Sequence, residues 1–94
     1  MSDIYSKAIE HFGKNKQLFQ TCEECAELIQ AISKATRYDG ASYILNVAEE
    51  VADVEVMLEQ VKRIFDLKPG IIDEYKRMKL KRLERYIDGQ QTGQ

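Results

Sequence analysis

The chain has 94 residues, of which 44% are hydrophobic and 32% are charged, and its formal net charge is −2. A chain of this length forms one small domain, residues 1–94, with limited capacity to bury its own apolar surface. Basic and acidic residues are mixed, which excludes the concentrated basic surface of a general nucleic-acid binder. No apolar run approaches the roughly 20 residues of a membrane span, and the N-terminus lacks a signal-peptide core. We therefore expect a cytoplasmic protein without membrane or nucleic-acid partners.

The spacing of apolar residues predicts an all-α fold with four helices. The predicted helices span about residues 3–12, 16–37, 42–65 and 71–87. Ser2 or Asp3 supplies the first helix cap, and Pro69-Gly70 separates the last two helices. The tail, residues 88–94, is polar and is expected to fray.

An apolar stripe with alternating steps of three and four residues runs along each long helix. On the second helix the stripe consists of Leu18, Cys22, Cys25, Ile29 and Ile32. On the third helix it consists of Ile44, Val47, Val51, Val54, Leu58, Val61 and Phe65. The tight turn at Asp39-Gly40 should pack these helices antiparallel. Since so small a chain cannot cover both stripes, we expect an antiparallel four-helix unit that is completed by homo-oligomerisation, as a dimer or a tetramer.

The stretch TCEECAELIQ, residues 21–30, contains two overlapping motifs. Cys22 and Cys25 form a CxxC, the spacing of redox dithiols and of half a zinc site. The cysteines lie in the middle of a predicted helix beside glutamates, whose negative charge disfavours a thiolate, and a zinc site would have to add His11 and one more ligand. We favour a packing role for the cysteines, with redox or metal chemistry as the alternative.

The second motif in this stretch belongs to a repeated acidic pattern, EECAE in one long helix and EEVAD in the other. The two blocks supply Glu23, Glu24 and Glu27, and Glu49, Glu50 and Asp53. Antiparallel packing would bring the blocks face to face, where like charges repel, so a cation is expected between them. Oxygen ligands favour Mg²⁺ or Mn²⁺ over zinc or copper. The alternative is that charge-rich helices carry solvated acidic clusters by accident.

The paired motif, ExxE at Glu24 and Glu27 and ExxD at Glu50 and Asp53, resembles that of the MazG-like nucleoside triphosphate pyrophosphohydrolases. These enzymes belong to an all-α superfamily that also contains the dimeric dUTPases. The flanking segments EECAELIQAISK and NVAEEVADVEVMLEQV are similar to its two metal helices, and the resemblance covers about residues 13–86.

The resemblance implies that these four carboxylates are both the Mg²⁺ ligands and the catalytic residues, with Mn²⁺ as a possible substitute. It implies hydrolysis of an NTP or dNTP to the monophosphate and pyrophosphate, in a dimer or tetramer, and a house-cleaning role in the nucleotide pool. Many members carry a Lys/Asn/Arg run after the second motif. This chain has KRMKLKRLERY there, without asparagine, so the phosphate contacts do not carry over.

Other charged residues are secondary candidates. Lys76 and Lys79 fall within the predicted inner arc of the fourth helix, and Lys34 lies two turns beyond Glu27. A lysine that faces inward either extends its ammonium to solvent or meets an anion, so these three could bind substrate phosphates. Glu23 and Glu49 are neighbours of the predicted metal ligands. They could orient those ligands or a water molecule, or they could be exposed to solvent. A non-catalytic helical dimerisation module is the other class of function that the sequence allows.

Overall fold

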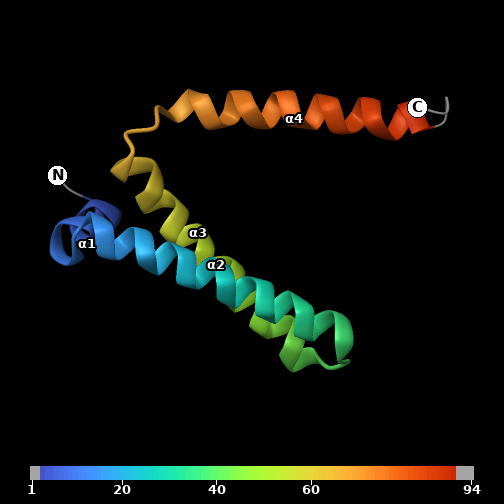
Figure 1. The fold of residues 1–94 in the computed structure, drawn as a ribbon, viewed down its shortest axis with the longest axis horizontal. Coiled ribbons are helices and arrows are strands. Elements are labelled where there is room, and N and C mark those ends of the chain that lie inside the picture. Colours follow the sequence, from blue (N-terminus) through green and yellow to red (C-terminus); the bar gives the residue numbers. More distant parts are fainter. Residues whose placement is uncertain (1–2, 91–94) are drawn as a thin grey trace.

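The computed structural model describes residues 3–90, and this part of the chain forms four α-helices and no strand (Figure 1). The helices are α1 (Ile4–Phe12), α2 (Lys14–Arg37), α3 (Ala41–Ile64) and α4 (Pro69–Gln90). The prediction of an all-α chain is confirmed. Residues 88–90, expected to fray, continue α4, whereas residues 91–94 lie outside the described residues. None of the described helices combines the length and apolar character needed to cross a membrane.

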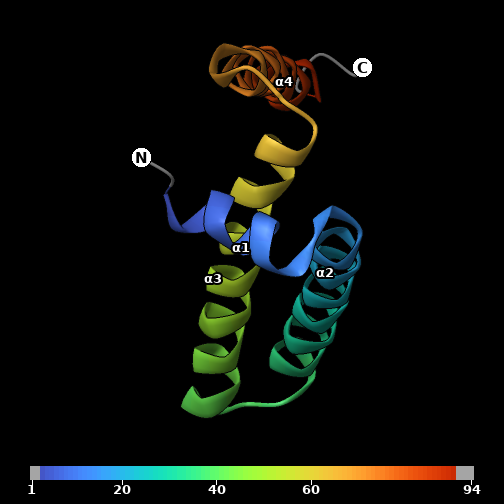
Figure 2. The same cartoon turned by 90° about the vertical axis from the view of Figure 1, so that its left-hand side faces the viewer.

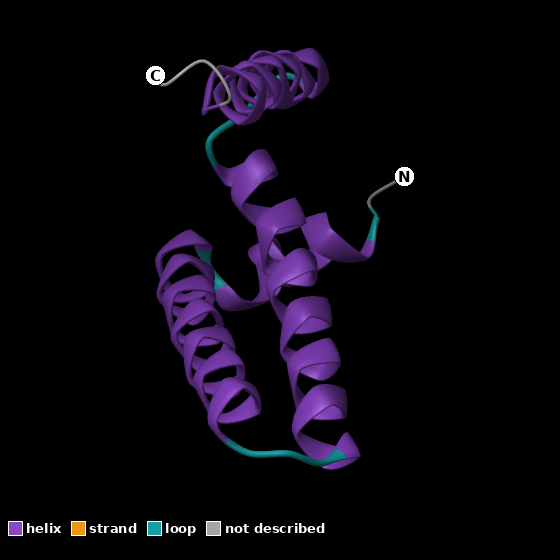
Figure 3. Cartoon of the chain, turned by 90° about the vertical axis from the view of Figure 1, so that its right-hand side faces the viewer, coloured by secondary structure: helices purple, strands orange, loops and turns teal. Residues whose placement is uncertain are grey.

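Short connections with defined backbone geometry separate the helices (Figure 3). Asp3 caps α1, since its Oδ1 accepts a hydrogen bond of 2.8 Å from the backbone N–H of Ser6. Ser2, the other candidate for this cap, lies outside the described residues. Gly13 both ends α1 and starts α2, and its φ of 95° lies in a region that glycine adopts without strain. The absence of a side chain there lets the chain turn sharply between two helices.

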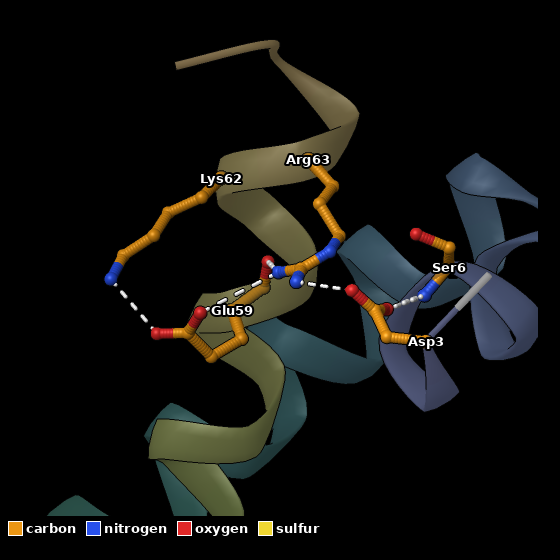
Figure 4. Close-up of polar contacts among 5 residues, drawn as sticks. All are labelled: Asp3, Ser6, Glu59, Lys62 and Arg63. Carbon is orange, nitrogen blue, oxygen red and sulfur yellow. Dashed lines mark hydrogen bonds and ion pairs between the residues drawn. The ribbon is translucent and has the colours of Figure 1, made fainter. Parts of the chain in front are cut away.

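The helices α2 and α3 form an antiparallel hairpin, and α1 crosses its open end (Figure 2). At the closed end, the rings of Tyr38 and Tyr43 stack with their centroids 5.4 Å apart. At the open end, the Arg63 guanidinium of α3 donates to Asp3 across 2.6 Å (Figure 4). The same guanidinium lies 4.9 Å from the centroid of the Tyr5 ring. Glu59 accepts from Arg63 and from Lys62 in the same group of contacts. This polar cluster therefore fixes α1 on α3.

On α2 the buried seam of the hairpin lies one residue before the predicted apolar stripe, at Gln17, Thr21, Glu24, Leu28, Ala31 and Ala35, all buried or half-buried. On α3 the stripe residues Val47, Val54 and Val61 lie in the seam as predicted, whereas the other seam positions precede the stripe by one residue and are Tyr43, Glu50, Met57 and Ile64. The packing role expected of the cysteines is not met by Cys22 within one chain, since it is exposed, while Cys25 is half-buried. Ile29 is 69% exposed and Ile44 is 62% exposed. The seam takes small and polar residues because they let the two helices approach closely, and the larger apolar side chains remain at its edge.

Because the seam does not coincide with the apolar stripes, the two outer sides of the hairpin differ in polarity. One step along a helix is a turn of 100°, and in an antiparallel pair the positions that follow the seam point to the same side on both helices. We call this side the apolar face; it consists of Leu18, Cys22, Cys25, Ile29 and Ile32 of α2 and Ile44, Val51 and Leu58 of α3. Most positions that precede the seam carry polar side chains and form the polar face, which consists of Gln20, Glu23, Glu27, Gln30 and Lys34 of α2 and Asn46, Glu49 and Asp53 of α3; Val56 is an apolar residue on the same side. The acidic blocks thus lie on one side of the hairpin and the cysteines on the other.

The helix α4 packs against none of the other helices within residues 3–90 and extends away from the hairpin (Figures 1 and 2). The predicted four-helix unit is therefore not formed by one chain. The missing contacts leave α4's apolar side chains at the surface, and Leu80 is 64% exposed.

Candidate metal centre

Carboxylates from both acidic blocks meet in the middle of the hairpin. Glu24 and Glu50 occupy facing seam positions, and Glu27 lies one turn further along α2. One carboxylate oxygen from each of these three residues lies within 4.8 Å of the others. Asp53 lies close enough for its charge to raise the pKa values of Glu24 and Glu50. The structure thus brings together three of the four carboxylates that the two sequence motifs single out and places Asp53 beside them.

Two oxygens of this group are shielded from solvent without a hydrogen-bond partner. They are Oε2 of Glu24 and Oε2 of Glu50, one from each helix. An ionised oxygen that loses water and gains no donor is costly, and such atoms are uncommon in folded proteins. The other oxygen of Glu24 accepts a 2.9 Å hydrogen bond from Nε2 of Gln20. Gln20 therefore fixes the orientation of this carboxylate while Oε2 stays free for another partner.

The pKa values of the two seam glutamates, Glu24 and Glu50, also show that their ionised forms are disfavoured in the fold. Burial raises the pKa of Glu24 above its usual value near 4.5, and the charges of Glu27 and Asp53 raise it further, while the Gln20 hydrogen bond opposes them. Burial also raises the pKa of Glu50, followed by repulsion from Glu27, Asp53, Glu24 and Glu49. Either a proton or a bound cation would relieve this excess of negative charge.

The group is accessible from the polar face. Glu27 and Asp53 are exposed, whereas Glu24 and Glu50 are half-buried beneath them. A cation can enter between the exposed pair and reach the shielded oxygens from solvent. Carboxylate oxygens alone form the hard donor set that Mg²⁺ and Mn²⁺ prefer, and Mg²⁺ commonly retains several waters beside one or two carboxylates. The residues present therefore fit a divalent cation of this class.

The remaining candidates lie outside this group. Glu23 and Glu49 are exposed neighbours on the polar face, and of the two the charge of Glu49 contributes to the raised pKa of Glu50. Lys34 is exposed on the same face, two turns beyond Glu27.

Within one chain, Lys76 and Lys79 are not brought to the carboxylates. Lys76 lines a hollow at the α3–α4 elbow together with Glu59 and Lys62, more than two turns of α3 away from Glu50. Lys79 lies further out on α4 and is exposed. The inward orientation expected of these lysines is wrong for the single chain because α4 does not fold back on the hairpin.

Sequence reasoning missed a row of glutamines beside the carboxylates. Gln17 and Gln60 are buried and pair across the hairpin, with Nε2 of Gln17 donating to Oε1 of Gln60 over 2.7 Å. Gln20 lies between this pair and Glu24. The four-residue spacing from Gln20 to Glu24 was the available signal, because side chains at this spacing meet on a helix.

The cysteines have no part in this centre. They lie on the apolar face, and within residues 3–90 the carboxylates of Glu24, Glu27 and Glu50 form the group of three or more candidate ligands that come together. This arrangement gives no support to the alternative of a zinc site.

The fold and the site define a helical hairpin with a carboxylate centre between its two long helices. Comparison of the chain with protein-family models, with curated proteins and with solved structures finds no match to any of them.

Proposed function

We propose that this protein is a cytoplasmic, Mg²⁺-dependent nucleoside triphosphate pyrophosphohydrolase of the MazG-like kind. It would convert an NTP or dNTP to the monophosphate and pyrophosphate, with a house-cleaning role in the nucleotide pool. The observation that carries the proposal is the pair of shielded, unpartnered oxygens on Glu24 and Glu50, which cluster with Glu27 and lie near the charge of Asp53. A chain selected for stability alone would place a donor opposite those oxygens.

The chain's own residues suit hydrolysis without a covalent intermediate. Glu24, Glu27, Glu50 and Asp53 would hold the ion, which when bound supplies charge neutralisation at phosphate oxygens and an activated water. Gln20 keeps the Glu24 carboxylate in one orientation, which limits the reorganisation needed when the site is loaded. Hydroxyl and thiol groups in the described hairpin lie away from the carboxylate oxygens: Thr21 donates to the backbone of Gln17, and the cysteines occupy the opposite face.

A product assay tests this function. A panel of NTPs and dNTPs is incubated with and without Mg²⁺, and we expect Mg²⁺-dependent release of monophosphate and pyrophosphate. Glu27→Gln and Asp53→Asn should each lower turnover by roughly a hundredfold or more, since one lost ligand costs several kcal/mol of transition-state stabilisation. Glu84→Gln, the same chemical change on exposed α4, serves as the control. Orthophosphate and a diphosphate as products would exclude this reaction.

A non-catalytic dimerisation module is the second candidate, and the unpartnered apolar side chains of the hairpin and of α4 favour it. It predicts no turnover and no response to metal. Mg²⁺ or Mn²⁺ should raise the melting temperature of the pyrophosphohydrolase, because the ion binds the native carboxylates and hardly binds the unfolded chain. Glu50→Gln should weaken that rise. A folded wild-type protein that shows neither turnover nor a thermal shift at millimolar metal would leave the module as the better description.

A further inference from the structure

An apolar arc on α4 is covered by none of the other helices within residues 3–90. Its members are Ile72, Tyr75, Leu80, Leu83, Tyr86 and Ile87, and all except half-buried Ile72 are more than half exposed. These positions cover one side of the helix at 100° per residue. Six large side chains on one side of a helix are far more than scattered surface residues would give, so this arc is a contact surface.

The elbow between α3 and α4 holds this arc away from its own hairpin. Two hydrogen bonds close the end of α3: Leu67 N–H donates to the carbonyl of Lys62 over 2.8 Å, and Asp66 N–H donates to that of Arg63 over 3.2 Å. This pair of bonds is the Schellman motif, with Asp66 at the left-handed position at a φ of 51°. Pro69 then starts α4 at once. From this elbow α4 leaves the hairpin and contacts none of the other helices within residues 3–90.

The hairpin presents a complementary surface. The apolar face carries exposed Ile29, Ile44 and Leu58, and Glu55 lies on the same side of α3, between Val51 and Leu58. The α4 arc contains the two lysines, Lys76 and Lys79, that sequence analysis singled out. Lys62, which follows the seam residue Val61, lies on this side as well and is paired with Glu59. The apolar surface thus matches the apolar arc, with Glu55 as an acidic group for the lysines of the arc.

The overall charges of the two parts are also opposite. The helix α4 carries six basic and four acidic residues, a net charge of +2, whereas residues 14–64 carry six basic and nine acidic residues, a net charge of −3. Opposite net charges favour the encounter of the two parts over long range, while the acidic blocks themselves lie on the polar face, away from the proposed contact. Every copy of the chain carries both surfaces, so two copies can satisfy each other by a two-fold exchange that leaves no surface open.

We propose that α4 of one copy packs on the apolar face of a second copy, and reciprocally, so that the protein is a homodimer with exchanged C-terminal helices. This inference specifies the homo-oligomer of the proposed function and does not depend on catalysis. It also assigns a place to Cys22 and Cys25, which would lie in the interface as small apolar side chains.

The native cysteines make the contact measurable. Leu80→Cys, Leu83→Cys and Tyr86→Cys are prepared one at a time, oxidised mildly, and run on non-reducing gels beside the wild type. We expect at least one variant to give a covalent dimer that disappears when Cys22 and Cys25 are both changed to serine. Lys81→Cys, on the opposite side of α4 from the arc, is the matched control and should give no such dimer. Circular dichroism checks that every variant remains helical.

Three outcomes would overturn the exchange. A disulfide within one chain, seen as a faster monomer, would show that α4 covers its own hairpin. A dimer that persists without Cys22 and Cys25 would place α4 against α4. Cross-linking of the wild type through its own cysteines would place hairpin against hairpin. Light scattering separates these from a wider failure: a monomer at micromolar concentration refutes the homo-oligomer itself, whereas a dimer without the α4 cross-link refutes the exchange alone.

Discussion

At the scale of single residues, the carboxylates of Glu24 and Glu50 lower the free energy of unfolding of the metal-free protein. Glu24 and Glu50 are drawn into the seam by their positions in the three-four repeat, where an apolar residue would pack without penalty. Each keeps an oxygen that neither solvent nor the protein satisfies. Such local conflicts concentrate at functional sites, since binding of the missing partner then stabilises the native state.

The first prediction concerns pH. Because the folded pKa of Glu24 and of Glu50 is raised above about 4.5, their contribution to stability is present below that value and is lost as pH rises through the folded pKa. The metal-free protein should therefore lose part of its stability between about pH 4.5 and neutral pH, and Glu50→Gln should flatten this loss. Denaturant titrations of both proteins across that range, with a chelator present, measure the difference.

The difference between the wild type and Glu50→Gln reports the pH dependence that comes from the seam glutamates. Hydrogen bonding to the Ser6 backbone and to Arg63 lowers the pKa of Asp3, and hydrogen bonding to Lys62 lowers that of Glu59. Their contribution has the opposite sign: it is present above their unfolded pKa values and is lost as pH falls. Both groups are common to wild type and variant, so they cancel in the difference. Parallel curves for the two proteins would contradict the assignment of charge repulsion to this site.

The second prediction concerns Gln20, which holds Glu24 through one hydrogen bond. Gln20→Met keeps the length of the side chain and removes the donor, so the Glu24 carboxylate should lose its fixed orientation. Partners of this kind, outside the ligands themselves, typically change metal affinity by 10- to 100-fold, and we expect Mn²⁺ to bind roughly tenfold more weakly. Calorimetric titration with Mn²⁺ measures the change. Gln30→Met, on the same polar face and exposed, should bind as the wild type does; equal affinity of all three would refute the role of Gln20.

At the scale of helices, the sequence predicted the existence, order and pairing of the elements but not the rotation of the long helices. Stripes that follow 3,4 steps predict a helix equally well wherever they lie around it. The stripes predicted that Ile29 and Ile44 lie inside, but both are exposed. On α2 the structure instead buries Gln17 and Ala31, one position before the stripe residues Leu18 and Ile32. One chain's sequence cannot distinguish a stripe that packs within the hairpin from one that awaits a second copy.

The same reasoning explains why the candidate site was predictable while the lysines were not. Glu24 and Glu50 belong to matching blocks on adjacent helices, and antiparallel pairing alone brings such blocks together. The position of Lys79 depends on the elbow, which rests on backbone hydrogen bonds and a left-handed Asp66. Aspartate adopts the left-handed conformation more readily than most residues, but an aspartate in the sequence does not by itself predict that conformation.

The third prediction tests this elbow. A β-branched residue is strained at positive φ, whereas glycine adopts it freely. Asp66→Val should therefore destabilise the protein by roughly 1–2 kcal/mol, and Asp66→Gly should be neutral or slightly stabilising. Chemical denaturation measures both. Asp73→Val, on exposed α4 with an ordinary helical backbone, controls for the chemical change, and an equal effect at both sites would show that the elbow is not set by Asp66.

At the scale of the whole molecule, the residues proposed to bind metal and the residues proposed to form the dimer lie in different parts of the chain. All four candidate ligands come from α2 and α3 of one chain, so the proposed metal centre would need only one hairpin. The apolar face and α4, by contrast, are left uncovered within residues 3–90, and in the proposed exchange a second copy would cover them. Metal binding and assembly should therefore respond to different substitutions.

The last prediction uses that separation. In the wild type, a tenfold rise in protein concentration should favour the native dimer by ~1.4 kcal/mol and raise the melting temperature by a few degrees. Leu83→Asp places a charge in the α4 arc and should abolish this concentration dependence, while Lys81→Asp, on the opposite side of the helix, should preserve it. The thermal shift caused by Mg²⁺ should survive in Leu83→Asp, since that substitution touches none of the carboxylates. If the shift instead disappears together with the dimer, the second copy contributes to the metal centre, and the hairpin by itself does not hold the ion.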